Sequence, residues 1–306
     1  MEKSPKMRVS MTGATGFVGS YTIQSLLETD HQLRALVRPS TDASWLEESG
    51  VEICRGAMTD ELSLRSLVDG AEVLIHTAYE SNPSEEENNL DYFRSNIFGS
   101  LTLLELAYQA RVRQFICTSS TYILRPDVNN PREVNNASID EDSSWVPASS
   151  RYLLHNAVLE SGCQTYFRQF GLNTTCFRCA WIYGIHPNLE RTVWRDIIEH
   201  TRSGERYESK FGCDVVAVED VALTLTASVG HPKAFGQVFN LAEMFVYNQE
   251  LAQIAWSVTG NQAKVPEQRL PKPKPISSER IKSLGINFHR GAEGIHTYFK
   301  RLNQLI

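Results

Sequence analysis

The chain has 306 residues, of which 42% are hydrophobic, and a formal net charge of −6. This length and hydrophobic content are enough for one large α/β domain or two smaller ones. The acidic balance argues against nucleic acid or an anionic membrane as partner and favours a small-molecule ligand. No apolar run approaches the roughly 18 residues of a membrane span, and the first residues carry no signal-peptide pattern, so we expect a soluble, cytoplasmic protein.

Short apolar segments alternate with segments of helical periodicity through the first half of the chain, which is typical of β-α-β units in a parallel sheet. The expected strands are Arg8–Thr12, Leu33–Val37, Val51–Arg55, Val73–Thr77 and Gln114–Thr118. The expected helices between them are Gly16–Glu28, Ser44–Ser49, Leu62–Leu67 and a long one at Leu90–Ala110. The fold class is therefore predicted to be α/β, a Rossmann doubly wound parallel sheet.

The second half continues less regularly, after a polar stretch at Asn129–Ser150 that we interpret as a surface loop. The expected elements are helix Ser150–Phe170, strand Thr174–Ile182, strand Asp214–Val218, helix Val221–Ser228, strand Val238–Leu241, a helix capped by Asn248, and a stiff connector at Pro271–Pro275. We expect residues 1–180, completed by 212–245, to form the Rossmann domain. Residues 181–211 and 246–306 would form a smaller, mainly C-terminal substrate-binding region.

Six scattered cysteines suit reduced thiols better than a disulfide framework. Cys176 and Cys179 form a C-x-x-C, which can indicate redox or zinc chemistry. The pair lies in an expected strand, however, where an odd spacing points the two side chains to opposite faces. We therefore expect no metal site.

The first expected strand ends in a glycine-rich turn, Gly13-Ala14-Thr15-Gly16-Phe17-Val18-Gly19, that leads directly into a helix. Gly13 permits the tight turn, Gly16 lets the backbone approach a pyrophosphate, and Gly19 allows close packing of helix and strand. The helix N-terminus adds unpaired N–H groups. This pattern in this place predicts a dinucleotide site.

Arg38 follows the second expected strand, where an NAD site usually carries an acidic residue for the ribose hydroxyl. An arginine there, with Ser40 and Thr41 close by, suits the 2′-phosphate of NADP. The alternative is a solvated surface arginine. We expect NADP, with NAD as the second possibility.

Together these segments resemble the extended short-chain dehydrogenase/reductase family, the NAD(P)-dependent epimerase/dehydratase group, and most closely its dihydroflavonol-reductase-like branch. The likeness rests on TGATGFVG, LRALVRPSTD, LIHTAY, Asn96 in SNIFG, Thr118-Ser119-Ser120, Tyr183-Gly184, Asp220 and Asn240. One departure is Gly56-Ala57-Met58, where relatives usually have Gly-Asp-Leu with the Asp on the adenine. Met58 can still pack against that ring.

The resemblance implies catalytic roles for Ser120, which would bind the substrate oxygen, and for Tyr152, which would exchange the proton, with Asn96 organising the site. It also implies a set of cofactor contacts. These are Gly13, Thr15, Gly16, Phe17, Val18, Arg38, Met58, Thr77, Ala78, Tyr79, Thr118, Tyr152, Asn156, Cys179 and Ile182.

A second departure concerns the catalytic pair itself, because the family pattern Y-x-x-x-K reads Tyr152-x-x-x-Asn156 here. An ammonium favours the phenolate by Coulomb attraction and also binds the nicotinamide ribose. Asn156 can imitate the second role and not the first. His155, if protonated, could partly compensate, although a solvated helix histidine is the more ordinary interpretation.

Three possibilities remain open at this point. One is an NAD(P)-dependent oxidoreductase, or an epimerase/dehydratase, acting on a carbonyl or nucleotide-sugar-like small molecule. Another is an NADP-binding, catalytically weakened regulator or scaffold. The third is an altered reaction that does not need a phenolate. His186, Arg191, Trp194 and Arg195 could receive a polar or anionic ligand, or could simply be helix-surface residues. A homodimer is possible, and so is a monomer.

Overall fold

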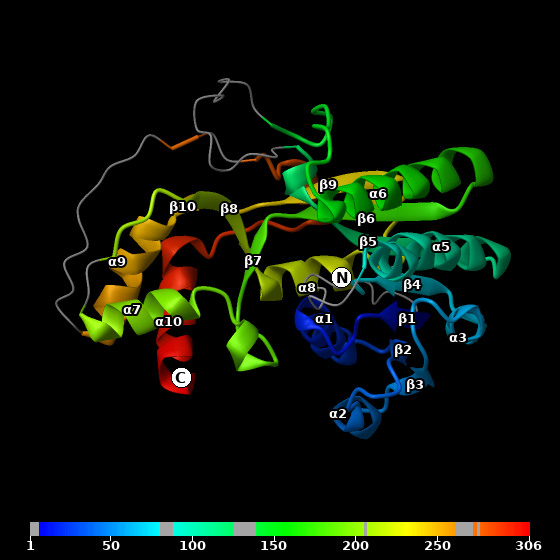
Figure 1. Ribbon diagram of the computed structural model, residues 1–306. Coiled ribbons are helices and arrows are strands. Elements are labelled where there is room, and N and C mark those ends of the chain that lie inside the picture. The colour runs from blue at the N-terminus through cyan, green and yellow to red at the C-terminus, as the bar shows by residue number, and fades with distance from the viewer. Residues whose placement is uncertain (1–5, 80–87, 125–138, 205–206, 261–271, 274–275) are drawn as a thin grey trace.

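The computed structural model describes residues 6–79, 88–124, 139–204, 207–260, 272–273 and 276–306. A large sheet crosses the molecule, and a smaller lobe is attached at one end (Figure 1). The expected Pro271–Pro275 connector and the first part of the expected Asn129–Ser150 loop fall largely outside the described residues. In the described part of the chain, no helix is long and apolar enough to cross a membrane.

The large sheet has seven parallel strands in the order β3-β2-β1-β4-β5-β6-β9. Their bounds are β1 Arg8–Thr12, β2 Gln32–Val37, β3 Glu52–Arg55, β4 Val73–His76, β5 Gln114–Ser120, β6 Asn173–Cys179 and β9 Gln237–Leu241. The order reverses between β1 and β4. In open α/β sheets a ligand binds at the carboxyl ends of the strands beside such a reversal.

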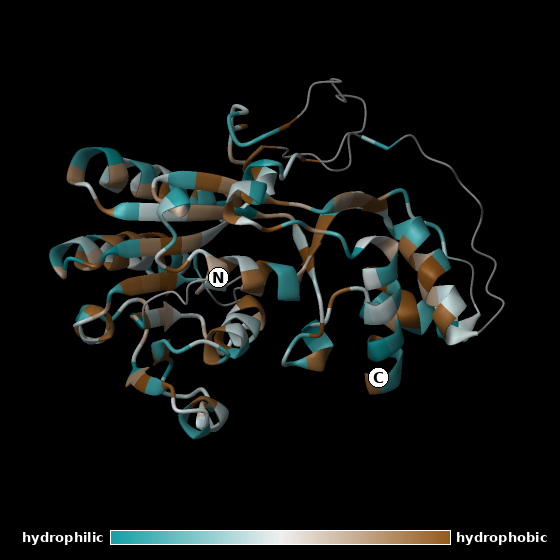
Figure 2. Cartoon of the chain, turned by 180° about the vertical axis from the view of Figure 1, so that it is seen from behind, coloured by the Kyte–Doolittle hydropathy of each residue, from teal (hydrophilic) through white to brown (hydrophobic). Residues whose placement is uncertain are grey.

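Helices cover both faces of this sheet, so the predicted doubly wound Rossmann fold is confirmed (Figure 1). One core layer holds α1 (Phe17–Leu27), α2 (Ser44–Glu48) and α8 (Val218–Ala227), and the opposite layer holds α3 (Glu61–Val68), α5 (Gly99–Gln109) and α6 (Arg151–Phe170). Figure 2 shows the apolar residues concentrated on the strands and on parts of the helix surfaces. The burial of apolar side chains in these two core layers is the main contribution to the stability of the fold.

The long helix expected at Leu90–Ala110 is interrupted. It consists of α4 (Asn89–Tyr92), a π-helical segment η1 (Phe93–Phe98) and α5. The wider π turn accompanies burial of Asn96, and Gly99 follows it at a point where a Cβ would lie 2.6 Å from the Met58 carbonyl oxygen. Close backbone packing therefore accompanies the change in helical type, which periodicity does not reveal.

The strand expected at Thr174–Ile182 is in fact two strands in two different sheets. β6 ends at Cys179, and β7 (Trp181–Tyr183) pairs with β8 (Gly212–Ala217), which pairs in turn with β10 (Met244–Tyr247). The expected strand near Asp214 is therefore present as β8, but it lies in this smaller sheet.

The smaller sheet packs with α7 (Arg195–Ser203), α9 (Asn248–Thr259) and α10 (Gly291–Leu305) around a core of its own. Asn248, the expected cap of α9, is instead the first residue of that helix. The Glu250 carboxylate accepts a hydrogen bond of 2.9 Å from the backbone N–H of Tyr247. The cap is thus supplied from inside the helix.

Candidate functional site

The glycine turn lies between β1 and α1, at the reversal of strand order. Gly13 has φ +79°, and a Cβ there would lie 2.7 Å from the backbone nitrogen of Ala78. A Cβ on Gly19 would lie 1.9 Å from the Gly13 carbonyl oxygen. Gly16 is the N-cap of α1 and is exposed. The conformation at Gly13 and the close approach at Gly19 require glycine, and an exposed helix N-terminus of this kind is suited to binding an anion.

The segment after β4 forms the second wall of this turn. The Thr77 hydroxyl donates to the Thr12 carbonyl oxygen at 3.0 Å, and the Ala78 N–H donates to the Thr12 hydroxyl at 3.4 Å. Thr77, Ala78 and Tyr79 are half-buried, as are Thr15, Phe17 and Val18 of the turn. The two segments expected to line a dinucleotide therefore lie side by side.

The residues expected to contact the adenosine follow β2 and β3. Arg38 is exposed directly after β2, and the Thr41 N–H donates to its carbonyl oxygen at 3.0 Å. Met58 is half-buried and packs against the core on the α3 side of the sheet. Both lie at the carboxyl ends of the first three strands.

Ser120 is the last residue of β5, and its side chain is buried. Its hydroxyl oxygen accepts the N–H of Tyr122 at 3.2 Å. Two positions earlier, Thr118 is half-buried. Cys179 pairs with Ser120 in the parallel register of β5 and β6, and Ile182 is half-buried on β7. These residues lie close to the carboxyl ends of β5 and β6 and on β7.

Tyr152 is the second residue of α6, and its ring centroid lies 5.0 Å from that of Tyr79. Burial raises the pKa of the Tyr152 phenol, and hydrogen bonds with Ser120 and Asn156 only partly oppose this. The phenol is thus brought together with the serine and the asparagine that the resemblance assigns to the same site. At neutral pH it is protonated.

Asn156 is buried one helical turn after Tyr152, and its Nδ2 donates to the Tyr152 carbonyl oxygen at 2.8 Å. An amide carries no charge and gives the phenolate no Coulomb stabilisation comparable to that of an ammonium.

His155 does not fill that gap, and it is not the solvated histidine expected from the sequence. It is 3% exposed, its ring stacks on Tyr79 with centroids 5.2 Å apart, and its Nε2 lies 3.4 Å from the Ser100 hydroxyl. Desolvation lowers the pKa of His155 to about 4. A neutral imidazole cannot replace the charge of a lysine.

Asn96 lies on the π-helical segment facing this region and is buried. Its Nδ2 donates to the Tyr92 carbonyl oxygen at 3.2 Å, and the Tyr92 hydroxyl lies 2.8 Å from that of Tyr79. Its contacts therefore lead through Tyr92 to Tyr79, which packs against Tyr152.

The residues of the expected polar cluster in the substrate region have separate surroundings. Trp194 is buried among Tyr183, Tyr298 and Phe299. Arg195 is paired with Glu190 and Glu199, at 2.7 Å in each case. His186 stacks on Phe17 with centroids 5.4 Å apart, so it belongs with the glycine turn. Arg191 is exposed.

Sequence reasoning missed a buried ion pair that fixes α6 against the sheet. The Arg178 guanidinium on β6 donates to the Glu160 carboxylate, with Nη2 and Oε1 2.5 Å apart, and both side chains are at most 2% exposed. The Ser119 hydroxyl also donates to Glu160, at 3.1 Å. Arg178 further donates to the carbonyl oxygen of Glu141, so the described part of the expected surface loop is tied to the sheet. The sequence signal that could have revealed this pair is the presence of one charged residue in each of two otherwise largely apolar segments.

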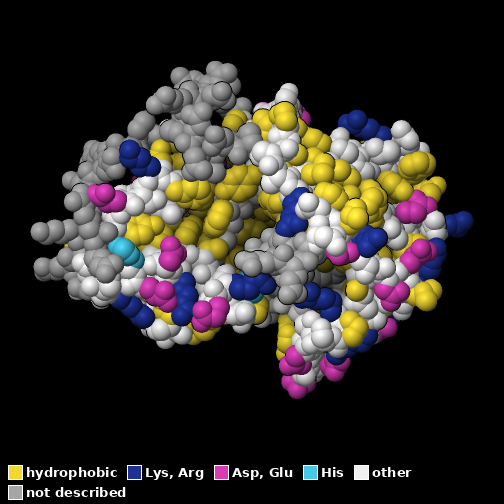
Figure 3. Space-filling model, in the orientation of Figure 1, with side chains coloured by type: hydrophobic (Ala, Val, Ile, Leu, Met, Phe, Trp, Pro, Cys, Tyr) yellow, Lys and Arg dark blue, Asp and Glu magenta, His cyan; other side chains and the backbone are white. Residues whose placement is uncertain are grey.

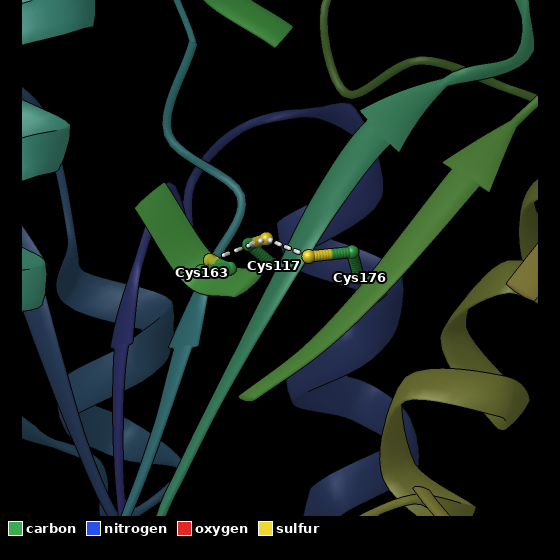
Figure 4. A group of neighbouring side chains, drawn as sticks. All are labelled: Cys117, Cys163 and Cys176. Carbon is green, nitrogen blue, oxygen red and sulfur yellow. Dashed lines mark hydrogen bonds between the residues drawn. The ribbon is translucent and has the colours of Figure 1, made fainter. Parts of the chain in front are cut away.

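The C-x-x-C residues do point to opposite faces of the sheet, with Cys176 in one core layer and Cys179 in the other. Cys176 instead meets Cys117 and Cys163, with sulfur distances of 3.5 Å between Cys117 and Cys176 and 3.7 Å between Cys117 and Cys163 (Figure 4). The hydrogen bond with Cys163 and burial hold the pKa of the Cys117 thiol well above its ordinary value. In the described residues this is the single group with metal-ligand spacing, and its thiols are protonated.

Comparison with known proteins agrees with this geometry. The NAD dependent epimerase/dehydratase family matches residues 9–242. The chain belongs to that family. It is 23% identical to cinnamoyl-CoA reductase 1 of Arabidopsis thaliana, over 97% of this chain and 89% of the relative. Its function is therefore of the NAD(P)-dependent, extended short-chain dehydrogenase type.

Two solved structures share the fold of this family member over almost their whole length. The UDP-glucose 4-epimerase of Thermotoga maritima superimposes with a TM-score of 0.79 and 21% identity, covering 98% of this chain and 99% of the other. The dTDP-glucose 4,6-dehydratase of Streptomyces venezuelae, solved with NAD, gives a TM-score of 0.78 and 18% identity, covering 98% and 97%. The described glycine turn suits the same kind of dinucleotide.

Proposed function

We propose that this protein is an NADPH-dependent carbonyl reductase in which Tyr152 acts as the proton donor. The observation that carries the proposal is the state of Tyr152, a buried phenol that contacts two uncharged partners, Ser120 and Asn156. Relatives that are named as reductases, such as the cinnamoyl-CoA reductase 1 of Arabidopsis thaliana, support the same type of reaction.

In the proposed reaction a bound nicotinamide supplies the hydride to the carbonyl carbon. The Ser120 hydroxyl orients the substrate oxygen, and the Tyr152 O–H donates its proton to that oxygen as the alcohol forms. One hydride and one proton are consumed for each carbonyl reduced. The Tyr79 ring packs against the Tyr152 ring, and the Tyr79 hydroxyl is in turn hydrogen-bonded to that of Tyr92.

The protonation state favours reduction over chemistry that begins with an oxidation. Reduction uses the phenol, which is the predominant form at neutral pH. Removal of a substrate hydroxyl proton uses the phenolate, which is roughly one molecule in a thousand at pH 7 even for an unperturbed tyrosine. Burial makes that fraction smaller still. Epimerisation and dehydration of nucleotide sugars that start from such a step are therefore disfavoured here.

The preference for NADPH rests on Arg38, which is exposed after β2 where it can approach a 2′-phosphate. Asn156 takes the place of the lysine on the ribose side and can donate a hydrogen bond from its amide.

The test measures initial rates of reduction with NADPH, and of oxidation of the corresponding alcohol with NADP⁺, between pH 6 and pH 10 over a panel of carbonyl compounds. Reduction should be independent of pH up to about pH 9, whereas oxidation should rise about tenfold per pH unit as phenolate forms. Tyr152→Phe should lower kcat for reduction by about 10²- to 10⁴-fold.

Tyr108→Phe is the matched control, because Tyr108 lies 40% exposed on α5 and packs against Tyr166 and Phe170. It should leave both profiles unchanged. Turnover that survives Tyr152→Phe would show that the tyrosine mechanism is wrong. Tight NADPH binding without turnover of any carbonyl would favour the regulatory or scaffold alternative.

A further inference from the structure

Tyr122 lies two residues after Ser120, in the short 3-10 helix η2 (Thr121–Ile123). Its backbone N–H donates to the Ser120 hydroxyl oxygen at 3.2 Å. This hydrogen bond therefore fixes the backbone of Tyr122 relative to the Ser120 hydroxyl.

The Tyr122 ring packs with Tyr152, Trp145 and Ile139 against Ile123, Leu124 and Leu153. Its hydroxyl oxygen is buried and has no hydrogen-bond partner among the described residues. A buried hydroxyl without a partner is unfavourable, because it has lost its hydrogen bonds to water without gaining others. Such a group is retained at little cost when a ligand supplies the missing acceptor.

The surroundings of this hydroxyl keep it neutral. Burial raises the pKa of Tyr122, and negative charge on Cys213, Tyr152 or Asp214 would raise it further. The Tyr122 phenol is therefore close to Tyr152 on α6 and to Cys213 and Asp214 on β8. It is a neutral hydrogen-bond donor, and the nearby Asp214 carboxylate disfavours an anionic ligand beside it.

The space between the two lobes is hollowed and lined by apolar side chains, over the region of β7, β8 and β10 (Figure 3). Trp181 on β7 is 36% exposed and meets Phe211 edge-on, with ring centroids 6.1 Å apart. An exposed indole beside a second aromatic ring is a surface suited to flat apolar ligands.

Three cations of the smaller lobe are engaged by carboxylates. Arg195 contacts Glu190 and Glu199, and Arg290 contacts Asp220 at 2.8 Å. Lys272 contacts Glu250 at 2.8 Å. A diphosphate would have to compete with these carboxylates, and Asp214 adds a negative charge near Tyr122.

We infer that Tyr122 is a specificity-determining residue of the proposed reductase. It donates a hydrogen bond to a second oxygen of the substrate while Ser120 and Tyr152 engage the reacting carbonyl. The substrate is then an uncharged compound with an aromatic or alicyclic body, a ketone or aldehyde, and a further hydroxyl or carbonyl oxygen. This inference rests on the proposed function for the identity of the reacting group.

The test uses binding as well as turnover, with the full-length protein saturated with NADP⁺. Calorimetry compares benzoin, an aromatic ketone with a neighbouring hydroxyl, with deoxybenzoin, which lacks that oxygen. The wild-type protein should bind benzoin more tightly than deoxybenzoin. Tyr122→Phe should weaken the binding of benzoin about tenfold, the loss typical of one hydrogen bond, and should leave the binding of deoxybenzoin unchanged. UDP-glucose serves as the charged competitor.

Tyr108→Phe is again the control and should bind both ketones as wild type does. Equal loss for both ketones in Tyr122→Phe, no discrimination by wild type, no saturable binding of either ketone, or binding of UDP-glucose in their place would each overturn the inference. Binding with the predicted discrimination but without reduction of benzoin would count against the proposed reaction and leave the role of Tyr122 standing.

Discussion

The side-chain amide of Asn156 donates to the carbonyl oxygen of Tyr152, 2.8 Å away on the preceding turn of α6. The residue that replaces the family lysine thus forms a hydrogen bond with the helix backbone as well as with the Tyr152 phenol. It contributes polarity and position to the site, and it contributes no charge.

Asn156→Lys should lower the pKa of Tyr152 by about 1–3 pH units, because an ammonium within about 4–6 Å favours the phenolate. The rate of alcohol oxidation at pH 7 should rise about tenfold or more, while reduction should change little. Ultraviolet titration of tyrosinate and the pH profile of oxidation measure the two effects. Asn156→Met, which adds length without charge, should show neither, and a rise in that variant would assign the effect to packing.

Arg38→Ala should weaken NADPH binding by about tenfold to a hundredfold and NADH binding by less than twofold. The reason is that a charge-assisted hydrogen bond to phosphate is worth about 1.5–3 kcal/mol and NADH has no such phosphate. Fluorescence titration of the two nucleotides measures this. Arg168→Ala, at an exposed position on α6, is the control. Equal losses for both nucleotides would contradict a contact with the 2′-phosphate.

Arg178→Met should lower the free energy of unfolding by about 3–5 kcal/mol, because the Glu160 carboxylate would remain buried without its partner. Replacing both residues, with Glu160→Gln added, should recover part of that loss. Urea unfolding gives the values. Arg65→Met removes an exposed pair with Glu61 on α3 and should cost at most about 1 kcal/mol. A loss in Arg178→Met no larger than in this control would refute the importance of the buried pair.

His155 should make stability depend on pH. Its pKa is about 4 in the folded protein and about 6.5 when unfolded, so the unfolded chain binds the proton more tightly. The contribution of neutral His155 to the free energy of unfolding is complete above pH 6.5 and is lost as the pH falls from 6.5 toward 4. Urea unfolding across this window should show that His155→Gln has a shallower slope, by up to one proton. His289→Gln, at an exposed position, should keep the wild-type slope.

The sequence predicted the Rossmann fold and the glycine turn between β1 and α1 because these depend on local rules. The glycines of the turn at Gly13 are required by backbone conformation and close approach, and alternating apolar segments define the strands. Ser120 and Tyr152, identified through the family resemblance, meet in the structure at a hydrogen bond. In contrast, the π-helical turn around Asn96 and the division of Thr174–Ile182 between two sheets were not predicted, since both arise from packing between distant segments.

The sequence by itself determined which groups are present: a glycine turn for a dinucleotide, a tyrosine with a serine, and an asparagine where a lysine is usual. Only the tertiary structure decided their ionisation and their surroundings. Burial makes His155 neutral although the sequence left it free to be charged, pairs Arg178 with Glu160, and leaves the Tyr122 hydroxyl without a partner in the described part of the chain. The physical reason is that desolvation depends on which distant segments cover a side chain, and no local pattern of residues specifies that cover.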